Sequence, residues 1–161
     1  MKLKKRQLID LFDAMKQISE TEKNNKMFTY TLTLNEENLK PKVIAILSCA
    51  KPSDEFVKYE NEREALIAKY AERDDNGNYV VNASTNLIKI SNESVESATK
   101  EFNELNSKNV GIINKRTQEL DEYNKLLDTD VDVDVEQTSI EYFPEKINKI
   151  MMKALKHLIK S

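Results

Sequence analysis

The chain has 161 residues, a length typical of one domain, and we expect residues 1–161 to fold as a single domain. Its net charge of −3 gives no general attraction to phosphate backbones, so we do not expect nucleic acid as a partner. Hydrophobic residues make up 39% of the chain and glycine occurs only twice, which favours a mainly helical fold. The longest apolar run, Val43–Leu47, is too short to cross a bilayer, so we expect no membrane partner and synthesis in the cytoplasm.

The first third of the chain contains one clear helix and one ambiguous segment. Apolar residues recur at helical spacing over residues 4–19 and predict an amphipathic helix, and the polar residues 19–26 are typical of a linker. Residues 27–34 alternate threonine with apolar side chains, as in a strand. Residues 27–49 also place their apolar side chains near one helical stripe, with Pro41 as a kink or break. The pattern alone leaves helix and strand equally open.

The next segment predicts a helix, a turn and a short β excursion. Ser53 after Pro52 is a good helix start, so we predict a helix over residues 53–73. Asn76-Gly77 is typical of a tight turn, and residues 79–90 suit two short strands or one irregular β excursion. The side chains predicted to face inward from the helix are Phe56, Tyr59, Arg63, Leu66, Ile67 and Tyr70.

The longest periodic pattern runs from Val95 to Leu127. Its apolar stripe persists for about nine turns at 3.6 residues each, and Gly111 predicts a bend or a close packing contact in its middle. A helix of this length is not covered by a compact fold on all sides. We therefore expect it to pair antiparallel with the 53–73 helix, or to project toward a partner chain. The predicted protein-contact residues are Val95, Phe102, Leu105, Ile112, Ile113, Leu120, Tyr123 and Leu127.

The last third combines a strand with a helix. Valines 131, 133 and 135 alternate with acidic residues, which predicts a half-buried strand. Pro144 predicts the start of a helix that runs to about residue 159, with its lysines outward. The predicted inward side chains are Ile147, Ile150, Met151, Ala154, Leu155 and Leu158. The predicted fold is mainly α with a small β element (α+β), in which a long antiparallel helical hairpin is flanked by N- and C-terminal helices and short strands.

The acidic strand matches the calcium-loop template only in part. Carboxylates stand at positions 1, 3, 5 and 12 of the loop template, but Val135 occupies the position where the sharp turn requires glycine. Since glycine occurs only at 77 and 111, a glycine-rich nucleotide-binding loop is excluded. We expect no metal and no cofactor.

The sequence identifies no catalytic partner for its single cysteine or its single histidine. Cys49 is the only cysteine, so an internal disulfide is excluded, and we expect the side chain to be a small buried hydrophobic group. His157 is the only histidine and follows several lysines near a helix end, where the helix dipole favours a positive charge. We therefore expect a protein that is not an enzyme.

One part of the chain resembles a known group of proteins. The segment Lys51–Glu60, continued by Glu62–Leu66 and Lys69–Asn78, resembles a signature of small uncharacterised proteins of tailed bacteriophages. The similarity continues into Phe102–Asn106 and the late acidic strand. Such families have no assigned activity and no known catalytic residues, so the resemblance implies no site here. It does imply that the region from Phe28 to Leu47 is helical.

The expected function follows from the long stripe, the missing catalytic chemistry and the resemblance. We expect a non-enzymatic bacteriophage structural or assembly protein that binds other virion proteins or forms a homo-oligomer through its helices. It would be made in the host cytoplasm and reside in the virion. The alternative is a small phage-encoded intracellular inhibitor or regulator that binds a host protein through its acidic strand face and helices.

Overall fold

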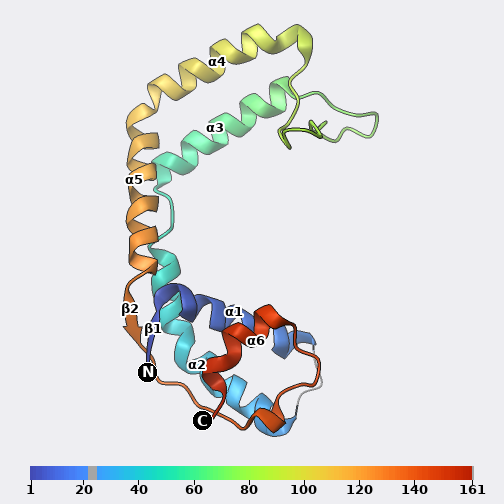
Figure 1. Cartoon of the computed structure of the whole chain (residues 1–161). Coiled ribbons are helices and arrows are strands. Elements are labelled where there is room, and N and C mark those ends of the chain that lie inside the picture. The colour runs from blue at the N-terminus through green and yellow to red at the C-terminus, as the bar shows by residue number, and fades with distance from the viewer. Residues whose placement is uncertain (22–24, 161) are drawn as a thin grey trace. The chain divides into compact units, whose positions relative to one another are not determined.

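The computed structural model describes residues 1–21 and 25–160, and these residues form six α-helices and one two-stranded antiparallel sheet (Figure 1). The predicted mainly helical class with a small β element is confirmed. The helices are α1 (Lys5–Thr21), α2 (Lys26–Ser48), α3 (Asp54–Tyr70), α4 (Val95–Lys108), α5 (Val110–Leu127) and α6 (Lys149–Leu155). The strands are β1 (Lys2–Lys4) and β2 (Asp130–Asp132), and short 3₁₀ turns lie at Asn92–Ser94 (η1), Ile140–Tyr142 (η2) and Lys156–Leu158 (η3).

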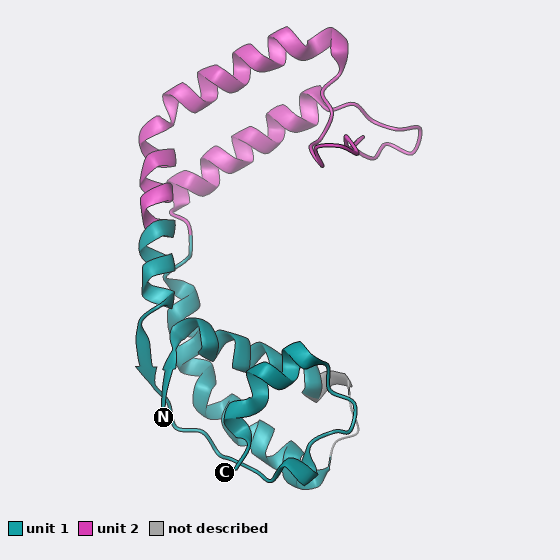
Figure 2. Cartoon of the chain, viewed as in Figure 1, with its two compact units in different colours: residues 1–51, 120–161 teal, residues 52–119 magenta. Residues whose placement is uncertain are grey.

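The chain divides into two compact units. Unit 1 comprises residues 1–51 and 120–161, and unit 2 comprises residues 52–119 (Figure 2). Helix α5 begins in unit 2 and ends in unit 1. It stays a prediction that residues 1–161 form a single domain, in which the two units unfold together.

Unit 1 contains most of the buried apolar side chains. Helix α1 is confirmed almost as predicted, and it packs against α2 and α6. Its fully buried residues Leu8, Leu11 and Met15 repeat at helical spacing, so one face of the helix supplies the core. The hydrophobic core of unit 1 also contains Phe28, Leu32, Leu39 and Val43 from α2 and Leu155 and Leu158 from the C-terminal segment.

The ambiguous segment is a single helix, α2. Asn25 caps it by accepting a hydrogen bond from the backbone N–H of Met27 at 2.8 Å. The hydroxyls of Thr31 and Thr33 donate to carbonyl oxygens four residues earlier, each at 3.0 Å. Pro41 lies inside the helix. The strand alternative is therefore wrong. Of the predicted linker 19–26, residues 19–21 belong to α1 and Lys26 belongs to α2, and residues 22–24 lie outside the described residues.

The predicted acidic strand is present as β2, and its partner is a strand that the sequence pattern did not predict. Strand β1 pairs antiparallel with β2, with Leu3 opposite Val131. Val133, just beyond β2, is buried, whereas Asp130 and Asp132 are exposed. The chain thus alternates buried and exposed side chains as period two requires.

The last helix begins five residues later than predicted. Phe143 is buried and its ring lies 4.6 Å from that of Phe28, centroid to centroid, so this contact holds the chain before α6 against the core. Asn148 then caps α6 by accepting from the N–H of Met151 at 2.9 Å. Ile150, predicted to face inward, is 83% exposed, and that prediction is wrong.

Unit 2 contains the predicted antiparallel pair, formed by α3 and α4 (Figure 1). The hydroxyl of Ser53 caps α3 by accepting from the N–H of Phe56 at 3.2 Å. Tyr59 and Tyr70 are buried between the helices, whereas Arg63, predicted to face inward, is exposed.

The segment between α3 and α4 is one irregular β excursion. Isolated antiparallel bridges join Ala71 to Ile90, Arg73 to Tyr79 and Val81 to Ile88. The predicted turn is confirmed, with Gly77 at φ +81°. The carboxylate of Asp74 accepts from the N–H groups of Asn76 at 2.9 Å and Asn78 at 2.8 Å, so it serves the turn.

The long predicted helix is two helices that meet at Asn109. The side-chain amide of Asn109 donates to the carbonyl of Leu105 at 2.8 Å and competes with the helical ladder, and the carbonyl of Asn109 accepts from Ile113 at 3.0 Å. The continuous nine-turn helix is therefore wrong. The break lies two residues before Gly111, and no atom approaches the position of a Cβ at Gly111 within 4 Å.

Candidate functional site

The structure distributes the predicted contact residues over two helices and two units. In unit 2, Val95 is exposed, and Phe102, Leu105, Ile112 and Ile113 are half-buried. In unit 1, Leu120 is exposed, Tyr123 packs against the core, and Leu127 is buried inside it. Because α4 and α5 are separate helices, these residues do not form one uninterrupted stripe. Their role in contacting a partner stays a prediction.

Unit 2 has little buried core for its length. Of residues 52–119, all of which are described, only Tyr59, Tyr70 and Ala98 are buried. Two paired helices form a single layer, so each covers the centre of the other's apolar stripe and leaves its flanks in water. Leu66 and Leu105 are such flanking residues, and both are half-buried.

A groove runs between α3 and α4 on one side of this layer; we call it the α3–α4 groove. Its lining combines small or apolar side chains with charged ones, and Leu105 is the one predicted contact residue among them. The lining residues are Glu62, Ala65, Leu66, Glu101, Glu104, Leu105 and Lys108.

One carboxylate of the groove is satisfied within the chain. Glu101 accepts from Lys69 Nζ with both oxygens at 2.8 Å and from the hydroxyl of Tyr70 at 2.7 Å. The hydrogen bonds from Lys69 and Tyr70 lower the pKa of Glu101, and the hydrogen bond to Glu101 raises that of Lys69. Among the residues of unit 2, Glu62, Glu104 and Lys108 take part in no ion pair, so their charges are available to a partner.

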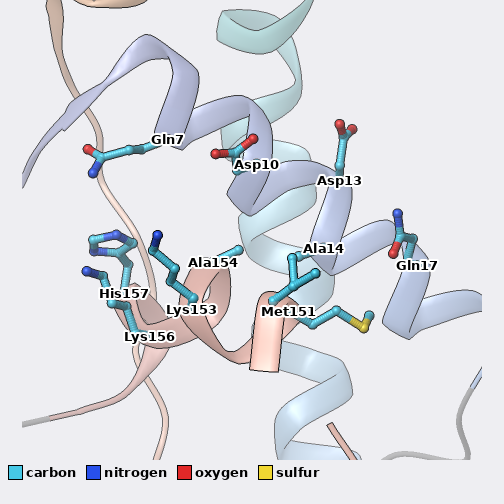
Figure 3. A pocket seen from close by; sticks show the side chains of 11 residues that line it. Gln7, Asp10, Asp13, Ala14, Gln17, Met151, Lys153, Ala154, Lys156 and His157 are labelled. Carbon is cyan, nitrogen blue, oxygen red and sulfur yellow. The ribbon is translucent and has the colours of Figure 1, made fainter. Parts of the chain in front are cut away.

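Unit 1 contains a second concave site, which we call the α1–α6 cleft. It has a volume of about 360 Å³ and lies between α1 on one side and α6 with η3 on the other (Figure 3). Ala14, Met151 and Ala154 give it an apolar floor. Its polar lining residues are Gln7, Asp10, Asp13 and Gln17 from α1 and Lys153, Lys156 and His157 from the C-terminal segment.

The charges of the cleft are segregated by wall. Asp10 and Asp13 project from α1, and Lys153 and Lys156 from the opposite wall (Figure 3). Within residues 1–21 and 25–160, none of these four side chains forms an ion pair within 4.0 Å. Sequence reasoning noticed the lysines of the last helix, but only the tertiary structure brings the aspartates of α1 opposite them.

His157 lies at the basic end of the cleft. Burial and the neighbouring charge of Lys156 lower its pKa below the usual value, whereas the sequence suggested that a helix end would favour the charged form. The backbone carbonyl of His157 accepts from the side-chain amide of Gln137 at 3.2 Å.

We predict that the pKa of His157 lies below its usual value and rises in the variant Lys156→Gln, because that change removes a nearby positive charge. Since His157 is the only histidine, its Hε1 resonance gives the pKa directly in an NMR pH titration. Lys149→Gln, which removes the same charge from α6 at a position outside the cleft lining, is the control. A pKa that is unchanged by Lys156→Gln would contradict this assignment of its cause.

The remaining reactive groups form no assembled site. Cys49 is exposed, and its thiol lies 3.4 Å from the carbonyl oxygen of Ala45, so the prediction of a buried cysteine is wrong. Within the described part of the chain, no three His, Cys, Asp or Glu side chains gather as metal ligands.

Comparisons of the chain with protein-family models, curated proteins and solved structures gave no match. None of the described helices is both long enough and apolar enough to cross a membrane.

Proposed function

We propose that this chain is a non-enzymatic assembly protein that associates with a second copy of itself through unit 2, as a component of a bacteriophage particle. The observation that carries the proposal is the α3–α4 groove, which places unpaired charges beside incompletely covered apolar side chains. The phage context rests on the sequence resemblance described above.

The packing of unit 2 supports association between helical pairs. A two-helix layer leaves one side of each apolar stripe in water, and two such layers stacked face to face form a four-helix bundle that covers both. Leu66 and Leu105 would then change from half-buried to buried, and each fully buried leucine contributes roughly 1.5–3 kcal/mol. With only three buried side chains of its own, unit 2 gains more from such packing than unit 1 does.

The charges on α4 favour a second copy as the occupant of the groove. Glu104 and Lys108 lie one helical turn apart on the same side of α4. In an antiparallel pairing of two α4 helices about a two-fold axis near Asn106, Glu104 of each copy faces Lys108 of the other. The face is thus complementary to itself, as a two-fold interface requires.

We expect Glu104→Lys to weaken the dimer by about tenfold, because two symmetric charge pairs of roughly 0.5–1 kcal/mol each are lost. The double variant Glu104→Lys/Lys108→Glu exchanges the charges and should restore the original dissociation constant. Sedimentation velocity of the full-length chain over a concentration series measures both.

Glu60→Lys is the matched control, since it makes the same charge change at an exposed position of α3 outside the groove. Circular dichroism checks that every variant keeps its helices. A chain that is monomeric at all concentrations, or a double variant as weak as the single one, would overturn the proposed interface. Mass spectrometry of purified particles tests the phage role, and absence of the chain from them would exclude a virion component.

A further inference from the structure

The α1–α6 cleft in unit 1 has features of a small-molecule site that the proposed assembly role does not use. It combines an apolar floor, one wall with two carboxylates and one end with several hydrogen-bond donors, all in a concavity of about 360 Å³. This volume and this mixture of an apolar lining with a few polar groups are typical of ligand sites.

The basic end of the cleft offers several hydrogen-bond donors. The side-chain oxygen of Gln7 already accepts from the backbone N–H of Lys4 at 3.0 Å, which leaves the amide NH₂ to face a ligand. Lys153 and His157 lie near this amide at the same end of the cleft (Figure 3). Ammonium, amide and imidazole N–H groups together match the oxygens of an anion.

The α1 wall also supplies two carboxylates, which act as acceptors. Asp10 and Asp13 are three residues apart, so they lie on one face of α1 and both line the cleft. Carboxylates near an anion site oppose a simple anion by repulsion, but they favour a ligand that also carries a positive charge.

We propose that the α1–α6 cleft binds a small zwitterionic molecule, with its anionic group at Gln7, Lys153 and His157 and its ammonium group at Asp10 and Asp13. Among the described residues, the charged side chains of the two walls form no ion pairs with each other, so they pair with the charged groups of the ligand. The carbon atoms of the ligand contact Ala14, Met151 and Ala154. An amino acid and an amino-alkyl phosphate share this chemistry, and the test separates the two.

The protonation of His157 gives the site a defined pH dependence. The charged groups that line the cleft together with this imidazole are Lys153 and Lys156 from the C-terminal segment and Asp10 and Asp13 from α1. Burial and the charge of Lys156 lower the pKa of His157 and so favour the neutral imidazole. A bound anion favours the charged form, so binding raises this pKa and becomes tighter as the pH falls toward it.

NMR titration of the full-length chain tests the proposal, with the single His157 Hε1 resonance as the reporter. The probes are phosphoethanolamine, β-alanine, inorganic phosphate and ethanolamine. We expect a saturable shift with at least one of the two zwitterions, and weaker binding of phosphate or ethanolamine alone. The stronger of the two zwitterions identifies whether the anionic group is a phosphate or a carboxylate.

Two variants assign the ends of the ligand. Lys153→Gln should weaken zwitterion binding by about tenfold, the effect of losing one charge-assisted hydrogen bond, whereas Lys149→Gln, outside the cleft lining, should not. Asp10→Asn/Asp13→Asn should weaken zwitterion binding but strengthen binding of inorganic phosphate. No saturable shift with either zwitterion, equal affinity for phosphate and the zwitterions, or equal effects of the two lysine variants would overturn the proposal.

Discussion

Replacement of Asn35 by leucine is expected to lower the free energy of unfolding by about 2–4 kcal/mol, although the two side chains have the same branched arrangement of heavy atoms. Asn35 is fully buried in α2, and its side chain binds both backbone polar groups of Glu136. Its oxygen accepts from the N–H of Glu136 at 2.9 Å, and its amide donates to the carbonyls of Glu136 at 2.9 Å and Thr31 at 2.8 Å. Leucine leaves the backbone N–H and carbonyl of Glu136 without this partner.

Urea unfolding followed by circular dichroism measures this loss. Asn38→Leu is the matched control, since Asn38 is exposed on the same helix and its replacement should change stability by less than about 0.5 kcal/mol. If the two variants were equally stable, the hydrogen bonds of Asn35 would contribute nothing net to the fold.

Truncation of Phe28 to alanine is expected to cost about 3–5 kcal/mol, the range for removing a buried aromatic side chain. Phe28 is fully buried, and its ring contacts that of Phe143, which holds the segment before α6 against the core. The loss therefore includes the cavity left in the core and the contact that anchors this segment.

A double-mutant cycle with Phe143→Ala separates these two contributions. Because the rings touch, the double variant should lose less stability than the sum of the single variants. Tyr30→Ala, at a position of the same helix that is 61% exposed, should cost less than about 1 kcal/mol. Strictly additive losses for Phe28 and Phe143 would contradict a direct coupling between them.

The elements that could be predicted from the sequence are those specified by local signals. The stripe of Leu8, Leu11 and Met15 defines α1, and the Ser53 cap defines the start of α3. Leu105, one of the predicted contact residues, lines the α3–α4 groove, and its role in contacting a partner stays a prediction.

The elements that could not be predicted depend on distant partners or on a side chain with two local options. Strand β1 forms because Leu3 pairs with Val131, and α6 begins late because Phe143 packs on Phe28. At Asn109, the side-chain amide donates to the carbonyl of Leu105, and α4 ends there. The apolar periodicity of the sequence continues past this residue, so it gave no sign of the break. The alternating threonines of α2 suggested a strand. In the structure the hydroxyls of Thr31 and Thr33 donate to carbonyls four residues earlier in the helix, and the hydrophobic pattern contains no information about these hydrogen bonds.

The division of unit 1 between the two ends of the chain determines the order in which the protein can fold. Asn35 and Glu136 are 101 residues apart, whereas the α3–α4 contacts of Tyr59 and Tyr70 bridge only 47 and 31 residues. Closing the longer loop costs more chain entropy and favours slower formation. During synthesis, the α3–α4 pair can therefore form before β2 and α6, which complete the core around α1 and α2, have been made. Unit 2, the insertion, can thus be assembled before unit 1, which it interrupts.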